Sequence, residues 1–289
     1  MTEFDFIIIS CNIKNEITKQ IVDSLGIKKT KVLDTTFKVL NCGEKFHLGN
    51  MELSRELPLG YIDIEDFKVC VNQSSLNDLQ YYYLYGNHRA IYKKLHYLEA
   101  YDRFFHHFRG KQVRILEIGV YKGGSLQMWK NYFGEDAKIV GIDIDPQCKL
   151  LEEDRIEILI GRQEDRNFLR YLKDKYGSFD VIIDDGGHHM EQQITTFDEM
   201  FDSLSDGGVY CCEDLCTSYW SEYEGGYGRE NTFVEFSKGL IDYINAFQNR
   251  SGQPHINRYT TQIKSISYFN TIAFFEKQEP ISRCITLLS

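Results

Sequence analysis

Basic residues are scarce in this sequence relative to acidic ones. It contains 33 lysines and arginines against 43 aspartates and glutamates, so its formal net charge at pH 7 is −10. Proteins that follow the phosphates of nucleic acids, or that bind anionic membrane surfaces, usually present a basic face. We therefore expect no nucleic-acid partner, and the charge is better suited to a neutral or polar small-molecule substrate.

Long apolar runs and paired cysteines are also missing. The run FIIIS, residues 6–10, is too short to cross a bilayer, so we expect no membrane insertion. The acidic start, MTEFDF, lacks the basic region and long apolar stretch of a secretory signal. The eight cysteines lack the C-x-x-C pairs of zinc sites, and several lie in apolar runs. We therefore predict reduced thiols and a cytoplasmic location.

The first 78 residues differ in pattern from the rest of the chain. Residues 4–10, 30–40 and 60–71 have the composition of strands, and residues 15–27 have the pattern of an amphipathic helix. This predicts a small α/β extension without a catalytic motif. We expect residues 1–78 to be an auxiliary region, either a lid or an element that makes the protein a homo-oligomer, and residues 79–289 to be the main domain.

An aromatic-rich segment opens the main domain, from about Leu79 to Phe108. Its apolar residues recur at helical spacing, which predicts a helix packed on the domain that follows. A second interpretation is that its part from Asn87 to Tyr97 covers a cofactor or a substrate.

Strands and helices alternate from residue 112 onward, which is typical of a parallel sheet. Five apolar runs predict parallel strands, and the chain ends in two more runs that are separated only by Phe269 and Asn270. So short a link has no room for a crossover helix, so these two strands should be antiparallel to each other. The sequence therefore predicts an α/β fold with a Rossmann-like, doubly wound sheet, mostly parallel with one reversed strand. The predicted strands are 113–119, 137–144, 155–161, 179–184, 207–214 and the hairpin 262–278.

The motif ILEIGVYKGGS lies where the first of these strands turns into a helix. Gly119, Gly123 and Gly124 allow a ligand to approach the backbone closely, and the helix start at Ser125 offers free N–H groups. Neither the P-loop motif nor G-x-G-x-x-G is present. Asp143 ends the next strand, where an acid can bind both hydroxyls of a ribose. With Glu117 lining the same cleft, these residues predict a nucleoside-containing cofactor. The alternative is a tight turn with a helix cap.

A polar segment, GRQEDRNFL, follows the third strand. Gln163, Glu164 and Asp165 lie at the ligand edge of the predicted sheet, where an adenine ring could rest. We take Gln163 as a candidate cofactor contact. A solvated loop in which Asp165 caps the next helix is the alternative.

Two apolar runs, VII and GVYCC, end abruptly in acids. Asp184 and Asp185 end the first, and Glu213 and Asp214 end the second. Ligands of open α/β sheets bind outside the carboxyl ends of the strands, so these carboxylates should gather in one cleft. A divalent cation would relieve their repulsion, and Mg²⁺ prefers oxygen ligands. Asp185, Glu213 and Asp214 are therefore candidate Mg²⁺ ligands. The alternative is that some of these acids cap helices.

Two histidines follow the first pair of acids. His188 lies three residues after Asp185 and is the candidate general base, because imidazole titrates near neutral pH. His189 competes with it by position alone and is also a candidate substrate contact. Asp184 is then left on the cofactor side of the cleft.

The segment LCTSYWSEYEGGYGREN is too long and too rich in glycine and tyrosine for a simple connection. Aromatic faces bind the flat apolar faces of sugars and of aromatic molecules. We predict that it forms a substrate lid, with Tyr219 and Trp220 in contact with the substrate. The alternative is that these aromatic side chains only cover the core.

These motifs together resemble a known family. The blocks ILEIGVYKGGSLQMWKNYFG, GIDID, GRQED, FDVIIDDGGHHMEQQ and VYCCEDLCTSYW look like those of the metal-dependent class I S-adenosylmethionine methyltransferases of natural-product and surface-sugar pathways. Within these, the sequence resembles the mycinamicin and macrocin sugar O-methyltransferases. The resemblance covers about Asn87 to Lys277 and leaves the first 80 or so residues unmatched.

The resemblance implies a seven-stranded sheet with Mg²⁺ on Asp185, Glu213 and Asp214 and with His188 as the base. It implies that the cofactor is S-adenosylmethionine, with its methionine part near Glu117 and Gly119 and its ribose at Asp143. The sequence departs from the family in one block, because Gly161, Arg162 and Gln163 stand where the family often has G-D-Q. The contacts to adenine are the part of the site that this departure affects.

The predicted function is the Mg²⁺-dependent transfer of a methyl group from S-adenosylmethionine to a hydroxyl oxygen, on a sugar of a surface-glycan or natural-product pathway. One alternative keeps the enzyme and changes the acceptor to a phenol, a catechol or another oxygen nucleophile. A second alternative is a cofactor-binding protein that serves in assembly without catalysis.

Overall fold

The computed structural model describes three parts of the chain, residues 7–9, 32–34 and 76–283. The chain divides into two compact units, one of residues 1–86 with 93–99 and the other of residues 87–92 with 100–289. The division predicted from the sequence, at residues 78 and 79, stays a prediction, and so does the auxiliary role of the first part.

Two short strands are described near the N-terminus. β1 (Ile7–Ile9) pairs in parallel with β2 (Val32–Asp34). Both lie inside strands that the sequence predicts. The predicted helix at 15–27 and the predicted strand at 60–71 lie outside the described residues.

The aromatic-rich segment forms two helices, so the prediction of a single helix is wrong. α3 (Asp78–Tyr85) ends at Gly86, whose backbone is extended, and α4 (Leu95–Phe105) runs into the 3-10 turn η4 (His106–Phe108). A capping box starts α3, in which Asn77 Oδ1 accepts from Gln80 N at 2.8 Å and Gln80 Oε1 accepts from Asn77 N at 2.9 Å. The aromatic periodicity continues across the non-helical residues and therefore conceals the break.

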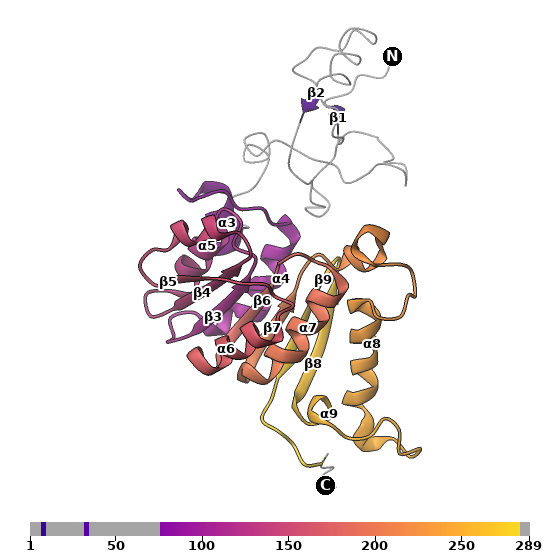
Figure 1. The fold of residues 1–289 in the computed structure, drawn as a ribbon. Helices are drawn as coiled ribbons and strands as arrows, with labels where there is room; N and C mark the ends of the chain where they lie inside the picture. The colour runs from indigo at the N-terminus through magenta and orange to yellow at the C-terminus, as the bar shows by residue number, and fades with distance from the viewer. Residues whose placement is uncertain (1–6, 10–31, 35–75, 284–289) are drawn as a thin grey trace. The chain divides into compact units, whose positions relative to one another are not determined.

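Seven strands form one sheet in the order β5-β4-β3-β6-β7-β9-β8 (Figure 1). Neighbours from β5 to β7 pair in parallel, and β9 is antiparallel to both β7 and β8. The predicted α/β class, with a mostly parallel sheet and one reversed strand, is confirmed, as is the final hairpin. The strands are β3 (Arg114–Ile118), β4 (Lys138–Asp143), β5 (Ile156–Ile160), β6 (Phe179–Asp184), β7 (Leu204–Cys212), β8 (Ile263–Phe269) and β9 (Ile272–Lys277).

Helices and 3-10 turns connect the strands. Side chains cap several of them: Asp165 Oδ1 accepts from Asn167 N at 2.9 Å at the start of α6, which confirms the capping interpretation of Asp165. In the described part of the chain, no helix combines the length and the apolar character that spanning a bilayer requires. The helical segments are α5 (Gly124–Phe133), η5 (Pro146–Leu151), α6 (Arg166–Tyr176), α7 (Met190–Met200), η6 (Phe201–Ser203), η7 (Leu215–Tyr219), η8 (Ser221–Tyr223), α8 (Phe233–Ile244), η9 (Ala246–Gln248) and α9 (Arg258–Gln262).

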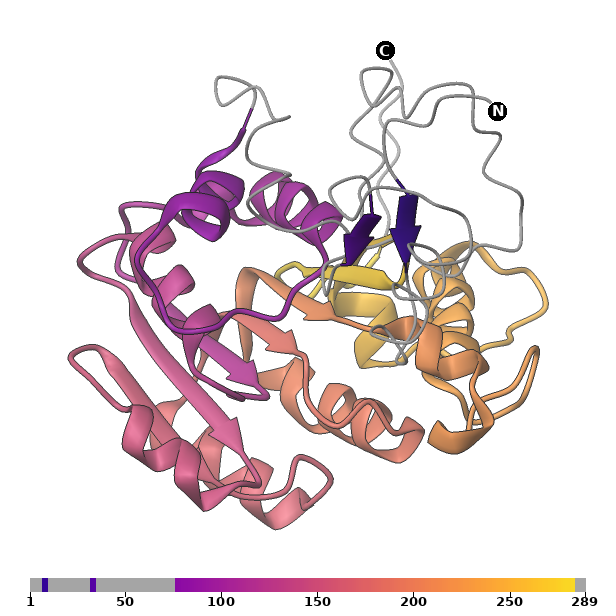
Figure 2. The same cartoon turned by 90° about the horizontal axis from the view of Figure 1, so that it is seen from above.

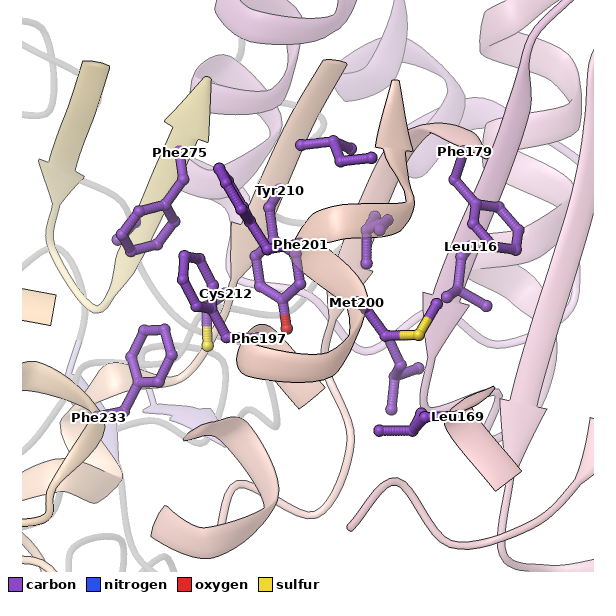
Figure 3. Close-up of a cluster of buried hydrophobic side chains, with 14 of the residues drawn as sticks. Leu116, Leu169, Phe179, Phe197, Met200, Phe201, Tyr210, Cys212, Phe233 and Phe275 are labelled. Carbon is purple, nitrogen blue, oxygen red and sulfur yellow. The ribbon is translucent and has the colours of Figure 1, made fainter. Parts of the chain in front are cut away.

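Alternate strand residues bury two separate aromatic layers, because successive side chains of a strand point to opposite faces. On one face α6, α7 and α8 cover the sheet, and Phe197 packs between Tyr210 and Phe275 with ring centroids 4.9 and 4.7 Å away (Figures 2 and 3). On the other face Trp129 of α5 and Phe274 of β9 both contact Tyr101 of α4. Both faces of the central strands are therefore covered, as a doubly wound sheet requires.

Phe197 should be one of the most costly core residues to truncate. Its side chain has no exposed surface, so Phe197→Ala leaves a cavity, and we expect the free energy of unfolding to fall by about 3–5 kcal/mol. Tyr171→Ala on α6 is the control, because Tyr171 is 50% exposed and its loss should change that free energy by only about 0.5 kcal/mol. Urea denaturation measures both, and equal effects would contradict this description of the core.

Candidate active site

The register of three neighbouring strands brings the site together. Asp184 at the end of β6 pairs with Ile118 of β3 on one side and with Cys212 of β7 on the other. The ladder extends one residue further, since Asp185 N donates to Ile118 O and Glu213 N donates to Asp184 O, both at 2.9 Å. The residues that follow these strands therefore leave the sheet at the same edge, as the sequence predicts.

One group of side chains in the described residues has the composition of a metal site. Ligand atoms of Asp185, His188 and Asp214 all lie within 4.8 Å of one another. His188 Nε2 is 3.8 Å from Asp185 Oδ1 and 3.7 Å from Asp214 Oδ2. Both His188 and Asp214 have positive φ, +60° and +53°, so each sits at a sharp turn that directs its side chain back toward the strand ends.

The donor set of this group is suitable for a hard divalent cation. It offers carboxylate oxygens from two strand ends, which are the ligands that Mg²⁺ prefers, and a neighbouring imidazole. These carboxylates are about one fifth to one quarter exposed, at 19% and 25%, so solvent and a substrate can reach them. His188 Nδ1 is buried and has no hydrogen-bond partner among the described residues, so Nε2 is the nitrogen that faces the carboxylates.

Glu213, the third predicted ligand, lies deeper than the other two. It is only 1% exposed, and its Oε1 accepts a hydrogen bond of 2.5 Å from Tyr101 Oη. Glu213 does not belong to the group of atoms within 4.8 Å. Its role as a metal ligand therefore stays a prediction.

Asp184, predicted to lie on the cofactor side, is fully buried. Its Oδ1 accepts from Gln163 Nε2 at 2.9 Å and its Oδ2 accepts from Tyr210 Oη at 3.1 Å. Burial raises the pKa of Asp184 to about 7, although both hydrogen bonds oppose that shift.

Gln163 connects Asp184 to the loop that carries the metal cluster. While its amide nitrogen binds Asp184, its Oε1 accepts from Gly187 N at 2.7 Å. Its side chain is 6% exposed. The structure thus gives Gln163 and Asp184 partners inside the protein, and their predicted contacts with a cofactor stay predictions.

The glycine turn after β3 is held by Asp143. Asp143 Oδ2 accepts from Val120 N at 2.8 Å and from Tyr121 N at 3.1 Å. Gly119 has φ of +92°, and a Cβ there would lie 2.0 Å from Asp185 O, so only glycine lets β3 pass the metal loop. Glu117, which is fully buried, accepts a 2.9 Å hydrogen bond from Ser125 Oγ at the start of α5.

The structure gives a second reason for the glycines at the start of α5, which the sequence did not reveal. Gly123 has φ of +74°, and a Cβ on Gly124 would lie 2.3 Å from Arg89 O and 2.5 Å from Ala90 O. Arg89 is fixed there, because its guanidinium donates to Leu151 O at 2.7 Å. Part of the segment predicted to cover a cofactor therefore lies against the helix start itself, and Gly124 makes room for the protein's own backbone.

The predicted lid forms the 3-10 turns η7 and η8. Tyr219 and Trp220 are 48% and 45% exposed, as expected for a surface that could receive a substrate. His189 does not join the metal cluster, because its Nδ1 lies 2.8 Å from Glu224 Oε2 at the end of η8. His189 thus ties the lid to the start of α7, and the two adjacent histidines serve different parts of the site.

A family match covers the region that contains these strand ends. Residues 116–215 match the family described as a methyltransferase domain. Over these residues the chain is similar to that methyltransferase family.

The curated proteins to which this chain is similar are O-methyltransferases. The 8-demethyl-8-alpha-L-rhamnosyl tetracenomycin-C 2'-O-methyltransferase of Streptomyces olivaceus is 36% identical over 63% of this chain and 50% of its own length. The mycinamicin VI 2''-O-methyltransferase of Micromonospora griseorubida is 37% identical over 61% of this chain and 47% of its own length. The chain thus spans about half the length of the curated relatives that it matches.

A solved structure has the same fold. The MycE methyltransferase from the mycinamycin biosynthetic pathway, in complex with Mg and SAH, is 34% identical with a TM-score of 0.61, over 65% of this chain and 50% of that one. Its complex with Mg, SAH and mycinamycin VI gives a TM-score of 0.62 at 32% identity, over 68% of this chain and 52% of that one. The predicted resemblance to the mycinamicin and macrocin sugar O-methyltransferases is confirmed.

Three side chains that support the candidate site could not be identified from the sequence. Tyr101 binds Glu213, Tyr210 binds Asp184, and Gln193 Nε2 donates to Glu213 O at 3.0 Å. All three are fully buried. Their only signal was a polar group at an apolar position of a helix or strand, which does not distinguish them from ordinary core residues.

Gly119→Ala tests the close approach of β3 to the metal loop. Gly110 also has positive φ, +68°, but nothing lies within 4 Å of the position of its Cβ, so Gly110→Ala measures the backbone strain alone. We expect Gly119→Ala to lower the free energy of unfolding by about 1–3 kcal/mol more than Gly110→Ala, because Asp185 O must also move. Chemical denaturation of both variants provides the comparison, and equal losses would show that the loop yields without cost.

Proposed function

We propose that this chain is a Mg²⁺-dependent methyltransferase that moves a methyl group from S-adenosylmethionine to a hydroxyl oxygen of a sugar. The observation that carries the proposal is the cluster of Asp185, His188 and Asp214 beside the glycine turn of a methyltransferase domain. The name of one relative, which methylates a rhamnosyl tetracenomycin at its 2' oxygen, supports a sugar as the acceptor.

Residues at the ends of β3 and β4 would hold S-adenosylmethionine. Glu117, Gly119 and Ser125 line the turn into α5, and Gly123 starts that helix. Asp143 ends β4 beside the same turn and would accept from the ribose hydroxyls. When it is bound, the cofactor supplies a methyl group on a positively charged sulfur.

Asp185 and Asp214, with Glu213, would hold Mg²⁺. When it is bound, the cation supplies a positive charge that makes a nearby acceptor hydroxyl a stronger acid. Two carboxylates from adjacent strand ends fix the position of that charge within the site. The cation held in this way would align the acceptor with the methyl donor, and we expect this alignment to be the largest contribution to the rate.

His188 would remove the proton from the acceptor hydroxyl. Nε2 is the receiving atom, because it faces the carboxylates while Nδ1 is buried. Nε2 lies 3.8 Å from Asp185 Oδ1 and 3.7 Å from Asp214 Oδ2, so the base would stand beside the residues that hold the cation. A base positioned in this way contributes roughly 10²–10⁴-fold to the rate.

Tyr219 and Trp220 would present aromatic faces to the acceptor, with the lid held by His189 and Glu224. Aromatic faces receive sugars and phenols alike, so a phenolic or catechol acceptor is the second candidate. The proposal also includes a cytoplasmic location, which the free thiols of Cys148 and Cys212 in the described part of the chain support, and a homo-oligomer.

The chain should methylate an acceptor from a panel of free and nucleotide-linked sugars, glycosides and catechols only when Mg²⁺ is present. EDTA should abolish methyl transfer from S-adenosylmethionine. Asp185→Asn should lower it by more than about 100-fold, since loss of a direct ligand exceeds the roughly 10–100-fold effect of an outer partner. Binding of S-adenosylhomocysteine, measured by calorimetry, should persist in this variant.

Asp180→Asn is the matched control for that experiment. Asp180 is on the same strand as Asp184 but accepts from Arg114 N, at the start of β3 and away from the ligand edge. Its replacement should leave turnover intact. Full activity in EDTA would contradict the role of the metal. Methylation of catechols alone would favour the second candidate function. Binding of S-adenosylhomocysteine without turnover of any acceptor in the panel would favour a non-catalytic role.

The two adjacent histidines should differ in their effect on turnover. His188→Ala should lower kcat by about 10²–10⁴-fold, because it removes the proposed base. His189→Ala breaks an exposed ion pair of about 0–1 kcal/mol, so turnover should fall less than about tenfold. Steady-state kinetics at saturating cofactor distinguishes the two, and the reverse order would transfer the role of base to His189.

A further inference from the structure

Tyr101 lies directly behind Glu213, on a helix that precedes the sheet in sequence. Both side chains are buried, with Tyr101 at 0% and Glu213 at 1% exposure. Tyr101 Oη donates to Glu213 Oε1 at 2.5 Å, at the short end of the range for a hydroxyl that donates to a carboxylate. This contact joins α4 to the metal end of β7 across 112 residues of sequence.

The ring of Tyr101 is held on several sides. It stacks on Phe105 at 5.7 Å and meets the rings of Trp129 and Phe274 edge-on at 5.0 and 6.3 Å. A tyrosine phenol has an ordinary pKa of about 10 and so keeps its proton at neutral pH, and here it points that proton at Glu213 Oε1. The phenol is therefore a hydrogen-bond donor in a fixed position.

The backbone of Glu213 is fixed as well. Its N–H donates to Asp184 O at 2.9 Å, and its carbonyl accepts from Gln193 Nε2 at 3.0 Å. The hydrogen bond from Tyr101 restrains the side chain of Glu213 as well.

We propose that Tyr101 is a positioning residue of the metal site, which holds Oε1 of Glu213 so that the glutamate presents its other oxygen to a divalent cation bound by Asp185 and Asp214. This inference rests on the proposed function, because it takes Glu213 to be a ligand. A phenol on one oxygen favours binding through the other alone, and Mg²⁺ in its strict octahedral geometry takes carboxylates in that way. Outer partners of this kind orient the ligands they touch.

The variant Tyr101→Phe tests the inference without removing the ring from the core. Mg²⁺ affinity is measured by calorimetry, and Mn²⁺ affinity by electron paramagnetic resonance, in the full chain. We expect both affinities to fall by about 10–100-fold. Binding of S-adenosylhomocysteine in the absence of metal should not change, which separates the effect from a general loss of structure.

Tyr132→Phe is the matched control. Tyr132 also donates its phenol proton to a carboxylate, at 2.7 Å from Asp102 Oδ1, but that carboxylate is not among the proposed metal ligands. This variant loses the same kind of hydrogen bond, so its metal affinity should stay at the wild-type value. A fall equal to that of Tyr101→Phe would overturn the inference.

A double-mutant cycle with Glu213→Gln completes the test. Glutamine can still accept from Tyr101 but has no anionic oxygen, so Glu213→Gln should weaken Mg²⁺ binding, and adding Tyr101→Phe should weaken it little further. This arm applies even if Tyr101→Phe does not fold, because unchanged affinity in Glu213→Gln overturns the inference by itself.

Two failures can be told apart. A wild-type chain that binds neither Mg²⁺ nor Mn²⁺ contradicts the metal part of the proposed function. A wild-type chain that binds both, with Tyr101→Phe binding them as tightly, contradicts only the role of Tyr101.

Discussion

The pairing of β6 with both of its neighbours is the constraint on which the site depends. Asp184 is level with Ile118 on β3 and with Cys212 on β7, so the acids that follow β6 and β7 leave the sheet together. Side chains alternate along a strand, and a slip of one residue would turn Asp184 to the opposite face and carry Asp185 away from Asp214. The apolar cores on both faces of the sheet specify the register, and the geometry of the site follows from it.

The carboxylates at this edge of the sheet differ in their burial and in their surroundings. Asp184 is buried, and burial raises its pKa to about 7, so near neutral pH it is in part uncharged. Glu213 is buried too and, like Asp184, accepts a hydrogen bond from a phenol. Asp185 and Asp214 remain partly exposed, at 19% and 25%, and face an imidazole. The negative potential is thus concentrated where a cation could bind.

The sequence predicted the sheet well because its signals are local. Apolar runs that end in acids, and a link too short for a crossover, are enough to place the parallel strands and the final hairpin. The break after α3 was missed because aromatic residues recur through it. Gly124 was assigned to a ligand, whereas Arg89 and Ala90 are the groups that require it. Contacts between segments far apart in sequence leave no such local pattern, and the partner of Glu213 was missed for the same reason.

The residues proposed to contact the acceptor and the residues proposed to hold the metal belong to different parts of the fold. The residues proposed to contact the acceptor lie in an irregular segment that starts at Asp214, whose carbonyl accepts from Thr217 N at 3.0 Å. The same segment is tied to α7 further along by His189 and Glu224. With both attachments in place, side chains such as Trp220 can change without disturbing the strand ends that hold the metal cluster. This separation allows one arrangement of strand-end acids to serve different acceptors, since fold and chemistry are set by the sheet and specificity by the loop.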